Sequence, residues 1–115
     1  MTRNIKSLKQ DDLPYIIGEV GVNHEGSMDR AKQMIEEIAR ACGDAVKSQA
    51  YKAATLASKH SPAYWDTNQE KTESQYELFK KYDTFDEDDF KELAAHAKQH
   101  NIDFIATPFD TESVD

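Results

Sequence analysis

Four polar side chains interrupt segments that otherwise have the composition of buried strands. Glu19 stands in the apolar run "YIIGEV", Lys47 and Gln49 stand in "DAVKSQA", and Thr107 stands in "IDFIATPFD". A lysine ammonium can hold a phosphate or a carboxylate, and amide and hydroxyl groups can orient a ligand. A carboxylate can transfer a proton or position water. These residue types together predict a site that binds an anion and carries out proton chemistry.

Three predicted strands would bring these side chains together. The first strand is expected at 15–20, the second from Asp44 to Ala50, and the third at 102–108, stopped by Pro108. The first two begin about thirty residues apart, the length of a βαβ unit, so parallel pairing is expected. Ligands bind at the C-terminal ends of parallel strands. Side-chain alternation therefore predicts that Glu19, Lys47, Gln49 and Thr107 converge there, with Asn23 and His24 on the first loop.

Helices are predicted between the strands. Ser27 is expected to cap a first helix that ends at Gly43, and its apolar face is formed by Ala31, Met34, Ile35, Ile38 and Cys42. Thr72 with Gln75, and Thr84 with Glu87, have the spacing of capping boxes for two further helices, with Tyr76 paired with Phe79 in the earlier one. Asn101 is expected to close the later one. Since Cys42 is the only cysteine, no internal disulfide can form, and we expect it to be a small buried apolar side chain.

The connections also carry predictions. The polar stretch 51–71 is longer than an ordinary βα connection, which favours a functional loop over the site. After the third strand, Asp110 or Thr111 could cap the first turn of another helix.

Composition limits the classes of partner. The 115 residues are 38% hydrophobic and 31% charged, as expected for one soluble domain, and no apolar stretch is long enough to span a membrane. A formal net charge of −8 argues against nucleic acid or an anionic membrane as a partner. A cytoplasmic location is the default expectation.

Structural interpretations stand beside the functional ones. Glu19 and Lys47 could form a structural ion pair at the rim of a sheet, and spacing alone does not decide between that pair and a site. His96 and His100 have the spacing of metal ligands on a helix, but without a third ligand nearby a solvated helix end is favoured. The acidic run 86–89 is interpreted as the first turn of its helix, where negative charge is stabilising.

Four motifs, "IIGEVGVNHEGS", "DAVKSQAYKA", "ESQYELFKK" and "IATPFDTESVD", resemble the N-terminal barrel segment of the N-acetylneuraminate (sialic acid) synthases. That family includes legionaminate, pseudaminate and spore-coat polysaccharide homologues. The resemblance covers 15–115 and leaves 1–14 as an N-terminal extension. It implies the first three strands of a (β/α)8 TIM barrel, incomplete in this chain, since a whole barrel takes about 250 residues. The remaining strands and an antifreeze-like C-terminal domain are expected beyond Asp115.

The resemblance also implies an activity. Family members condense phosphoenolpyruvate with the open-chain aldehyde of an N-acetylated hexosamine, such as N-acetylmannosamine, and release a nonulosonic acid and phosphate in carbohydrate biosynthesis. They use a divalent metal, manganese or magnesium, as a Lewis acid. Because the metal-binding histidines would lie beyond Asp115, no metal is expected to be bound by this segment alone. A homodimer is implied for the complete enzyme.

Residue roles follow from the matching motifs. Glu19 resembles the family's catalytic acid, and Lys47 resembles the lysine that binds phosphoenolpyruvate. Ser48 replaces a common aromatic and is expected to face the helix layer. The resemblance makes the substrate-binding residues Lys47, Gln49, Thr107, Asn23, His24, Gln75 and Tyr76.

Two alternatives to this activity remain. A truncated, non-catalytic barrel fragment could act by self-association or by pairing with a partner chain, because its strand edges would demand cover. A related synthase could instead use a different aldose as the acceptor. The Asn-His-x-Gly loop argues against this last possibility.

Overall fold

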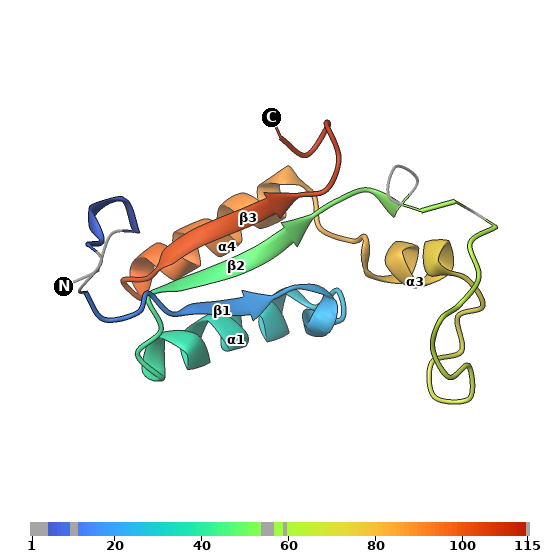
Figure 1. The fold of residues 1–115 in the computed structure, drawn as a ribbon, viewed down its shortest axis with the longest axis horizontal. Coiled ribbons are helices and arrows are strands. Elements are labelled where there is room, and N and C mark those ends of the chain that lie inside the picture. The colour runs from blue at the N-terminus through green and yellow to red at the C-terminus, as the bar shows by residue number, and fades with distance from the viewer. Residues whose placement is uncertain (1–4, 10–11, 54–56, 59, 115) are drawn as a thin grey trace.

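The computed structural model describes residues 5–9, 12–53, 57–58 and 60–114 (Figure 1). Its centre is a three-stranded parallel sheet in the order β1 (Ile17–Val20), β2 (Ala45–Ala50) and β3 (Asp103–Pro108). Each predicted strand is therefore confirmed, with the first shorter than expected. Parallel pairing is confirmed as well.

Two helices cover one face of this sheet. These are α1 (Met28–Arg40) and α4 (Glu87–Gln99), which lie behind the strands in Figure 1. A buried cluster joins them to the sheet, formed by Val20, Ala31, Ile35, Val46, Phe85, Leu93, Ala97 and Ile102. Alternation places the polar positions of the strands on the opposite face, where Ile17 is 42% exposed.

The remaining elements are short. The 3-10 helices η1 (Ile5–Ser7) and η2 (Val22–His24) precede the sheet and follow β1, respectively. Helix α3 (Gln75–Tyr82) lies beyond the C-terminal end of β2, apart from the sheet (Figure 1). None of the helices in the described ranges is long and apolar enough to cross a membrane.

The caps of α3 and α4 differ from those predicted. The hydroxyl of Ser74 accepts from the Glu77 N–H, and the carboxylate of Asp86 accepts from the Asp89 N–H in a complete capping box. The cap of each helix thus lies two residues after the predicted one, because another good capping residue stands nearer to the apolar pattern. The prediction for Ser27 is confirmed, since its hydroxyl accepts from the Arg30 N–H. The acidic run 86–89 lies at the N-terminus of α4, also as predicted.

The prediction that Cys42 is buried was wrong. Cys42 is exposed and adopts a left-handed conformation, with φ of 63°. It ends α1 in a Schellman motif, in which Gly43 N–H donates to the Ile38 carbonyl and Cys42 N–H donates to the Ala39 carbonyl. The helix stops before the apolar repeat reaches position 42. Asn101 ends α4 in the same way, with φ of 58°, and confirms its prediction.

The long connection after β2 contacts α3 and the residue that caps it. The hydroxyl of Tyr51 donates to the Phe79 carbonyl, and the Tyr51 ring packs edge-on against Phe79, a pairing predicted instead for Tyr76. An isolated antiparallel bridge joins Pro62 to Ser74. Part of the connection, 54–56 and 59, lies outside the described residues, and its role over a site stays a prediction.

The segment after β3 forms a turn in the described range. The carboxylate of Asp110 accepts from the Ser113 N–H and from the Lys52 N–H. Of the two predicted capping residues, Asp110 therefore supplies the capping oxygen. It also fixes this turn against the end of β2.

Candidate functional site

An acidic and a basic side chain lie side by side on the face of the sheet opposite to α1 and α4. Glu19 and Lys47 are direct partners in the β1–β2 register, and Glu19 Oε2 lies 3.1 Å from Lys47 Nζ. Their side chains are 47% and 33% exposed, respectively. An ion pair this exposed contributes about 0–1 kcal/mol to stability. The pair is therefore accessible to a ligand, and its contribution to folding is small.

Gly21 brings Gln49 into the same group. A Cβ added at Gly21 would lie 3.1 Å from Gln49 Oε1 and 3.2 Å from Glu19 Oε1. The side chains from β1 and β2 thus approach each other over a backbone that has no side chain. Sequence reasoning missed this contribution of Gly21, because the spacing of a glycine in a loop does not show which side chains surround it.

Thr107 shares this face through the sheet register. It is the β3 partner of Gln49, and paired residues of neighbouring strands point to the same side. Register therefore places Glu19, Lys47, Gln49 and Thr107 on one face of the sheet, and their convergence into a single site stays a prediction. Ser48, between Lys47 and Gln49, faces the helix layer as predicted and is 1% exposed. Its Oγ finds no hydrogen-bond partner in the described part of the chain.

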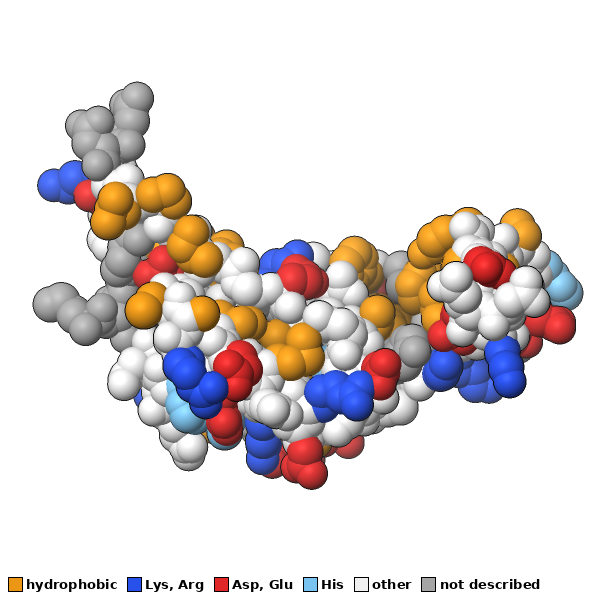
Figure 2. Space-filling model, turned by 90° about the horizontal axis from the view of Figure 1, so that it is seen from below, with side chains coloured by type: hydrophobic (Ala, Val, Ile, Leu, Met, Phe, Trp, Pro, Cys, Tyr) orange, Lys and Arg blue, Asp and Glu red, His pale blue; other side chains and the backbone are white. Residues whose placement is uncertain are grey.

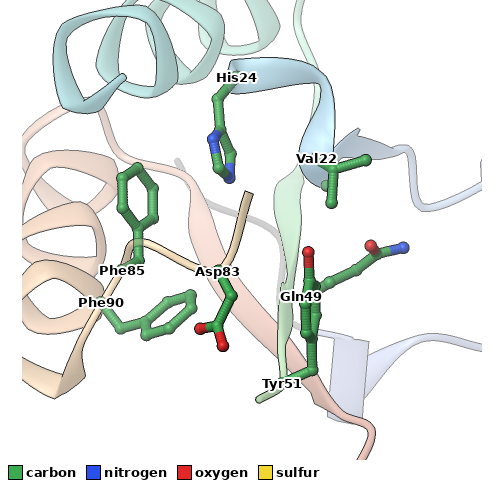
Figure 3. Close-up of a pocket in the computed structure, with 8 residues that line it drawn as sticks. Val22, His24, Gln49, Tyr51, Asp83, Phe85 and Phe90 are labelled. Carbon is green, nitrogen blue, oxygen red and sulfur yellow. The ribbon is translucent and has the colours of Figure 1, made fainter. Parts of the chain in front are cut away.

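The loop after β1 presents its two predicted site residues differently. Asn23 is exposed, whereas His24 is 5% exposed and stacks on Phe85, with ring centroids 4.4 Å apart (Figure 3). His24 Nδ1 accepts from the Gly26 N–H at 2.9 Å, so the neutral ring carries its hydrogen on Nε2. Burial lowers the pKa of His24 below its usual value. His24 thus holds the loop in place, and a direct contact with substrate stays a prediction.

The cavity beside His24 is too small for a substrate. Its volume is about 10 Å³, room for about one water molecule. Figure 3 shows the side chains of His24, Phe85 and Asp83 around it, and Gln49 and Tyr51 line it from the end of β2. The cavity is therefore a small gap in the packing where η2, β2 and the segment before α4 meet.

Gln75 and Tyr76 lie on α3, apart from the Glu19–Lys47 pair. The Gln75 amide donates to the Pro62 carbonyl at 3.3 Å, and the Tyr76 ring lies 6.0 Å from the Lys80 ammonium. Since α3 stands beyond the end of β2 (Figure 1), the structure does not bring these two side chains to the other predicted site residues. Their role in substrate binding stays a prediction.

Glu19 is the one carboxylate within the described part of β1 and β2, and the Lys47 ammonium lies beside it. Within the described residues, the group of three potential ligands that lie close together is elsewhere, between α1 and α4: Glu36, His96 and His100. The interpretation that His96 and His100 lack a third ligand was therefore wrong, because Glu36 is 60 positions from His96 and only the packing of the helices brings them together.

Charge on the surface is mixed. Figure 2 shows acidic and basic side chains interspersed over one face of the molecule, without a large area of one sign. Because the net charge is −8, a small anion would need a local basic group such as Lys47 to bind.

The chain is similar in sequence to several known proteins. The chain is 44% identical over 103 residues to the N,N'-diacetyllegionaminic acid synthase of Campylobacter jejuni, a match that covers 87% of this chain and 30% of that protein. It is 33% identical over 118 residues to the N-acetylneuraminate-9-phosphate synthase of Drosophila melanogaster, covering 100% and 31%. The chain thus spans about 30% of the length of these relatives.

A solved structure extends the likeness to the fold. The N-acetylneuraminic acid (sialic acid) synthetase of Leptospira borgpetersenii, in complex with citrate, matches with a TM-score of 0.65 and 30% identity, over 87% of this chain and 30% of that one. The predicted fold class, the first strands of an incomplete TIM barrel, is confirmed. Residues 34–115 match the family model described as the NeuB family, a range that includes Lys47, Gln49 and Thr107. This chain therefore belongs to the NeuB family.

Proposed function

We propose that this chain supplies the anion-binding edge of a synthase that condenses phosphoenolpyruvate with an N-acetylated hexosamine. The products would be a nonulosonic acid and phosphate. The observation that carries the proposal is the accessible Glu19–Lys47 pair at the carboxyl edge of the sheet, in a chain of the NeuB family. The names of the relatives, legionaminic acid and neuraminate phosphate synthases, support this class of product.

Lys47 would bind the anion. Phosphoenolpyruvate carries a phosphate and a carboxylate, and an ammonium forms charge-assisted hydrogen bonds with either group. One third of the Lys47 side chain is exposed, so the Nζ that now contacts Glu19 can also reach a ligand above the sheet. Gln49 and Thr107, on the same face, provide an amide and a hydroxyl to orient the bound molecule.

Glu19 would move the proton. In the condensation, the methylene carbon of phosphoenolpyruvate forms a bond with the aldehyde carbon. Water adds at the carbon that bears phosphate, and one of its protons goes to the Glu19 carboxylate. Glu19 then gives this proton to the former aldehyde oxygen, which becomes a hydroxyl group, and the carboxylate is restored. As the C–O bond to phosphate breaks, the oxygen that came from water forms the keto group and its remaining proton leaves with the phosphate.

The described strand-end residues do not fit a metal by themselves, so the steps assigned to this chain are anion binding, orientation and proton transfer. A location in the cytoplasm and a homodimeric assembly belong to the same proposal.

A non-catalytic fragment that associates with itself remains the second candidate. The observation that favours it is the uncovered face of the sheet, where Ile17 is 42% exposed. A second copy seated there would hide Glu19 and Lys47, which the synthase needs open to substrate. The two candidates therefore predict opposite accessibility for the same residues.

The proposal is tested with the full-length protein that contains this chain. It is incubated with phosphoenolpyruvate and N-acetylmannosamine, or with other N-acetylated hexosamines, and both phosphate and the mass of the sugar product are measured. Lys47→Met is expected to lose most of the turnover at low phosphoenolpyruvate. Lys32→Met is the matched control, because Lys32 pairs with Glu92 on the outer helices. Absence of a nine-carbon acid with every hexosamine, or equal turnover of both variants, would overturn the proposal.

A further inference from the structure

A row of polar side-chain contacts joins α1 to α4 on the outer side of the sheet. Lys32 contacts Glu92, and one helical turn further along both helices Glu36 meets His96 and His100. Glu36 Oε1 lies 3.0 Å from His96 Nε2 and 4.0 Å from His100 Nε2. Two imidazoles therefore converge on the same carboxylate oxygen.

A simple side-chain pair does not require two imidazoles near one carboxylate. One imidazole is enough to pair with Glu36, yet the potential ligand atoms of all three residues lie within 4.8 Å of one another. The two histidine rings come from successive turns of α4, with centroids 4.8 Å apart. The Lys32 ammonium forms its salt bridge with Glu92.

The geometry is close to that of a zinc site. Zinc–ligand bonds of about 2.0–2.1 Å in a tetrahedral arrangement place neighbouring ligand atoms about 3.3 Å apart. The two distances from Glu36 Oε1 bracket this value, so small side-chain rotations would bring the three ligands to one centre. Two imidazoles with one carboxylate form a ligand set that suits zinc. Partial exposure leaves room for water as a fourth ligand, since Glu36 and His100 are 39% and 38% exposed.

We propose that Glu36, His96 and His100 form a binding site for a divalent transition metal, zinc by preference, which links α1 to α4. The site lies at the end of the sheet opposite to the carboxyl edge, because His100 stands three positions before β3 begins. Metal bound there would hold the two helices together from outside the sheet. This inference is independent of the proposed synthase activity.

The test measures zinc binding by the full-length protein at neutral pH with isothermal titration calorimetry. The wild type is compared with Glu36→Gln, His96→Gln and His100→Gln. The wild type is expected to bind one zinc ion per chain at this site. Each of the three variants should lower the zinc affinity of the site by on the order of tenfold or more, since even supporting residues of metal sites have effects of this size. Glu92→Gln is the matched control, because it removes a carboxylate from the same pair of helices without touching the imidazoles.

A second measurement needs no variant. Zinc is added to the wild type before reaction with diethyl pyrocarbonate, and modified histidines are located by mass spectrometry. Zinc should protect His96 and His100 while exposed His60 still reacts. Equal modification with and without zinc would overturn the site. So would zinc affinities that are the same in all four variants and the wild type, and Glu36 and His96 would then form a hydrogen bond only.

Discussion

Glu19 and Lys47 face each other across neighbouring parallel strands, with 3.1 Å between the carboxylate oxygen and the ammonium nitrogen. The pair is held by strand register, so the backbone fixes the relation of the two groups before any ligand arrives. Because both side chains remain accessible, their ion pair adds little to stability, and the roles proposed for them are ligand binding and proton transfer. The predictions below separate these two roles.

Replacement of Gly21 by alanine should impair the site and leave the fold intact. The new Cβ would lie 3.1 Å from Gln49 and 3.2 Å from Glu19, so both side chains must move by a few tenths of an ångström. Small displacements of catalytic groups are costly, and we expect kcat/KM to fall by on the order of tenfold to a hundredfold. Steady-state kinetics and thermal unfolding of the full-length protein check this. Full activity in the variant would show that Gly21 does not position the two side chains.

The stability of the protein should decrease as the pH is lowered, because of His24. Burial lowers the pKa of His24 in the folded state, so the unfolded chain binds the proton more readily. The free energy of unfolding therefore decreases as the pH falls below about 6.5, by at most about 1.4 kcal/mol per pH unit. Denaturant unfolding between pH 8 and pH 5 measures this dependence.

His24→Gln is the control for that titration. The variant lacks the group, so its unfolding free energy should fall less steeply than that of the wild type over the same range. Contributions to the pH dependence that are common to both proteins cancel in the difference. Parallel pH profiles for the two proteins would exclude His24 as the source.

Ser48→Ala and Ser74→Ala should have opposite effects on stability. The buried Ser48 hydroxyl has no partner in the described part of the chain, so its removal should stabilise the protein or leave it unchanged, by about 0–1 kcal/mol. The Ser74 hydroxyl caps α3, and its loss should cost about 1 kcal/mol. Urea unfolding of both variants measures the difference. Equal destabilisation would mean that Ser48 is hydrogen-bonded in solution.

Gly18→Ala should destabilise the protein through a clash with α1. A Cβ at Gly18 would lie 2.5 Å from Ile38 Cδ1, and overpacking of this kind costs about 1–3 kcal/mol. Shortening the neighbour in the double variant Gly18→Ala/Ile38→Val should recover part of the loss. Unfolding free energies that simply add for the two single variants would contradict the contact.

Periodicity predicted the architecture because the relevant signals are local. Alternation in "DAVKSQA" identified β2 and both of its faces, and the register then aligned Glu19 with Lys47 as expected. Caps were predicted less well. Thr72 and Ser74 both fit the start of α3, and only the observed hydrogen bond to Glu77 distinguishes them. The choice between capping residues two positions apart depends on packing of the first turn, which sequence spacing does not contain.

Contacts between segments that are far apart in the sequence could not be predicted from its patterns. Glu36 and His96 lie 60 positions apart, and nothing in either helix pattern relates one to the other. The stacking of His24 on Phe85 has the same character, because it depends on how η2 meets the segment before α4. The faces of the strands were predicted from alternation, whereas these two contacts between distant helices and loops were not.

The most direct measurement is the steady-state kinetics of Glu19→Gln and Lys47→Met in the full-length protein, with phosphoenolpyruvate as the varied substrate. Loss of the proton-transfer group should lower kcat by on the order of 10² to 10⁴ in Glu19→Gln. Loss of the anion-binding ammonium should raise KM for phosphoenolpyruvate by about ten- to a hundredfold in Lys47→Met. Both variants should keep unfolding free energies within about 1 kcal/mol of the wild type. Wild-type kinetics together with reduced stability would contradict the site and make the pair structural.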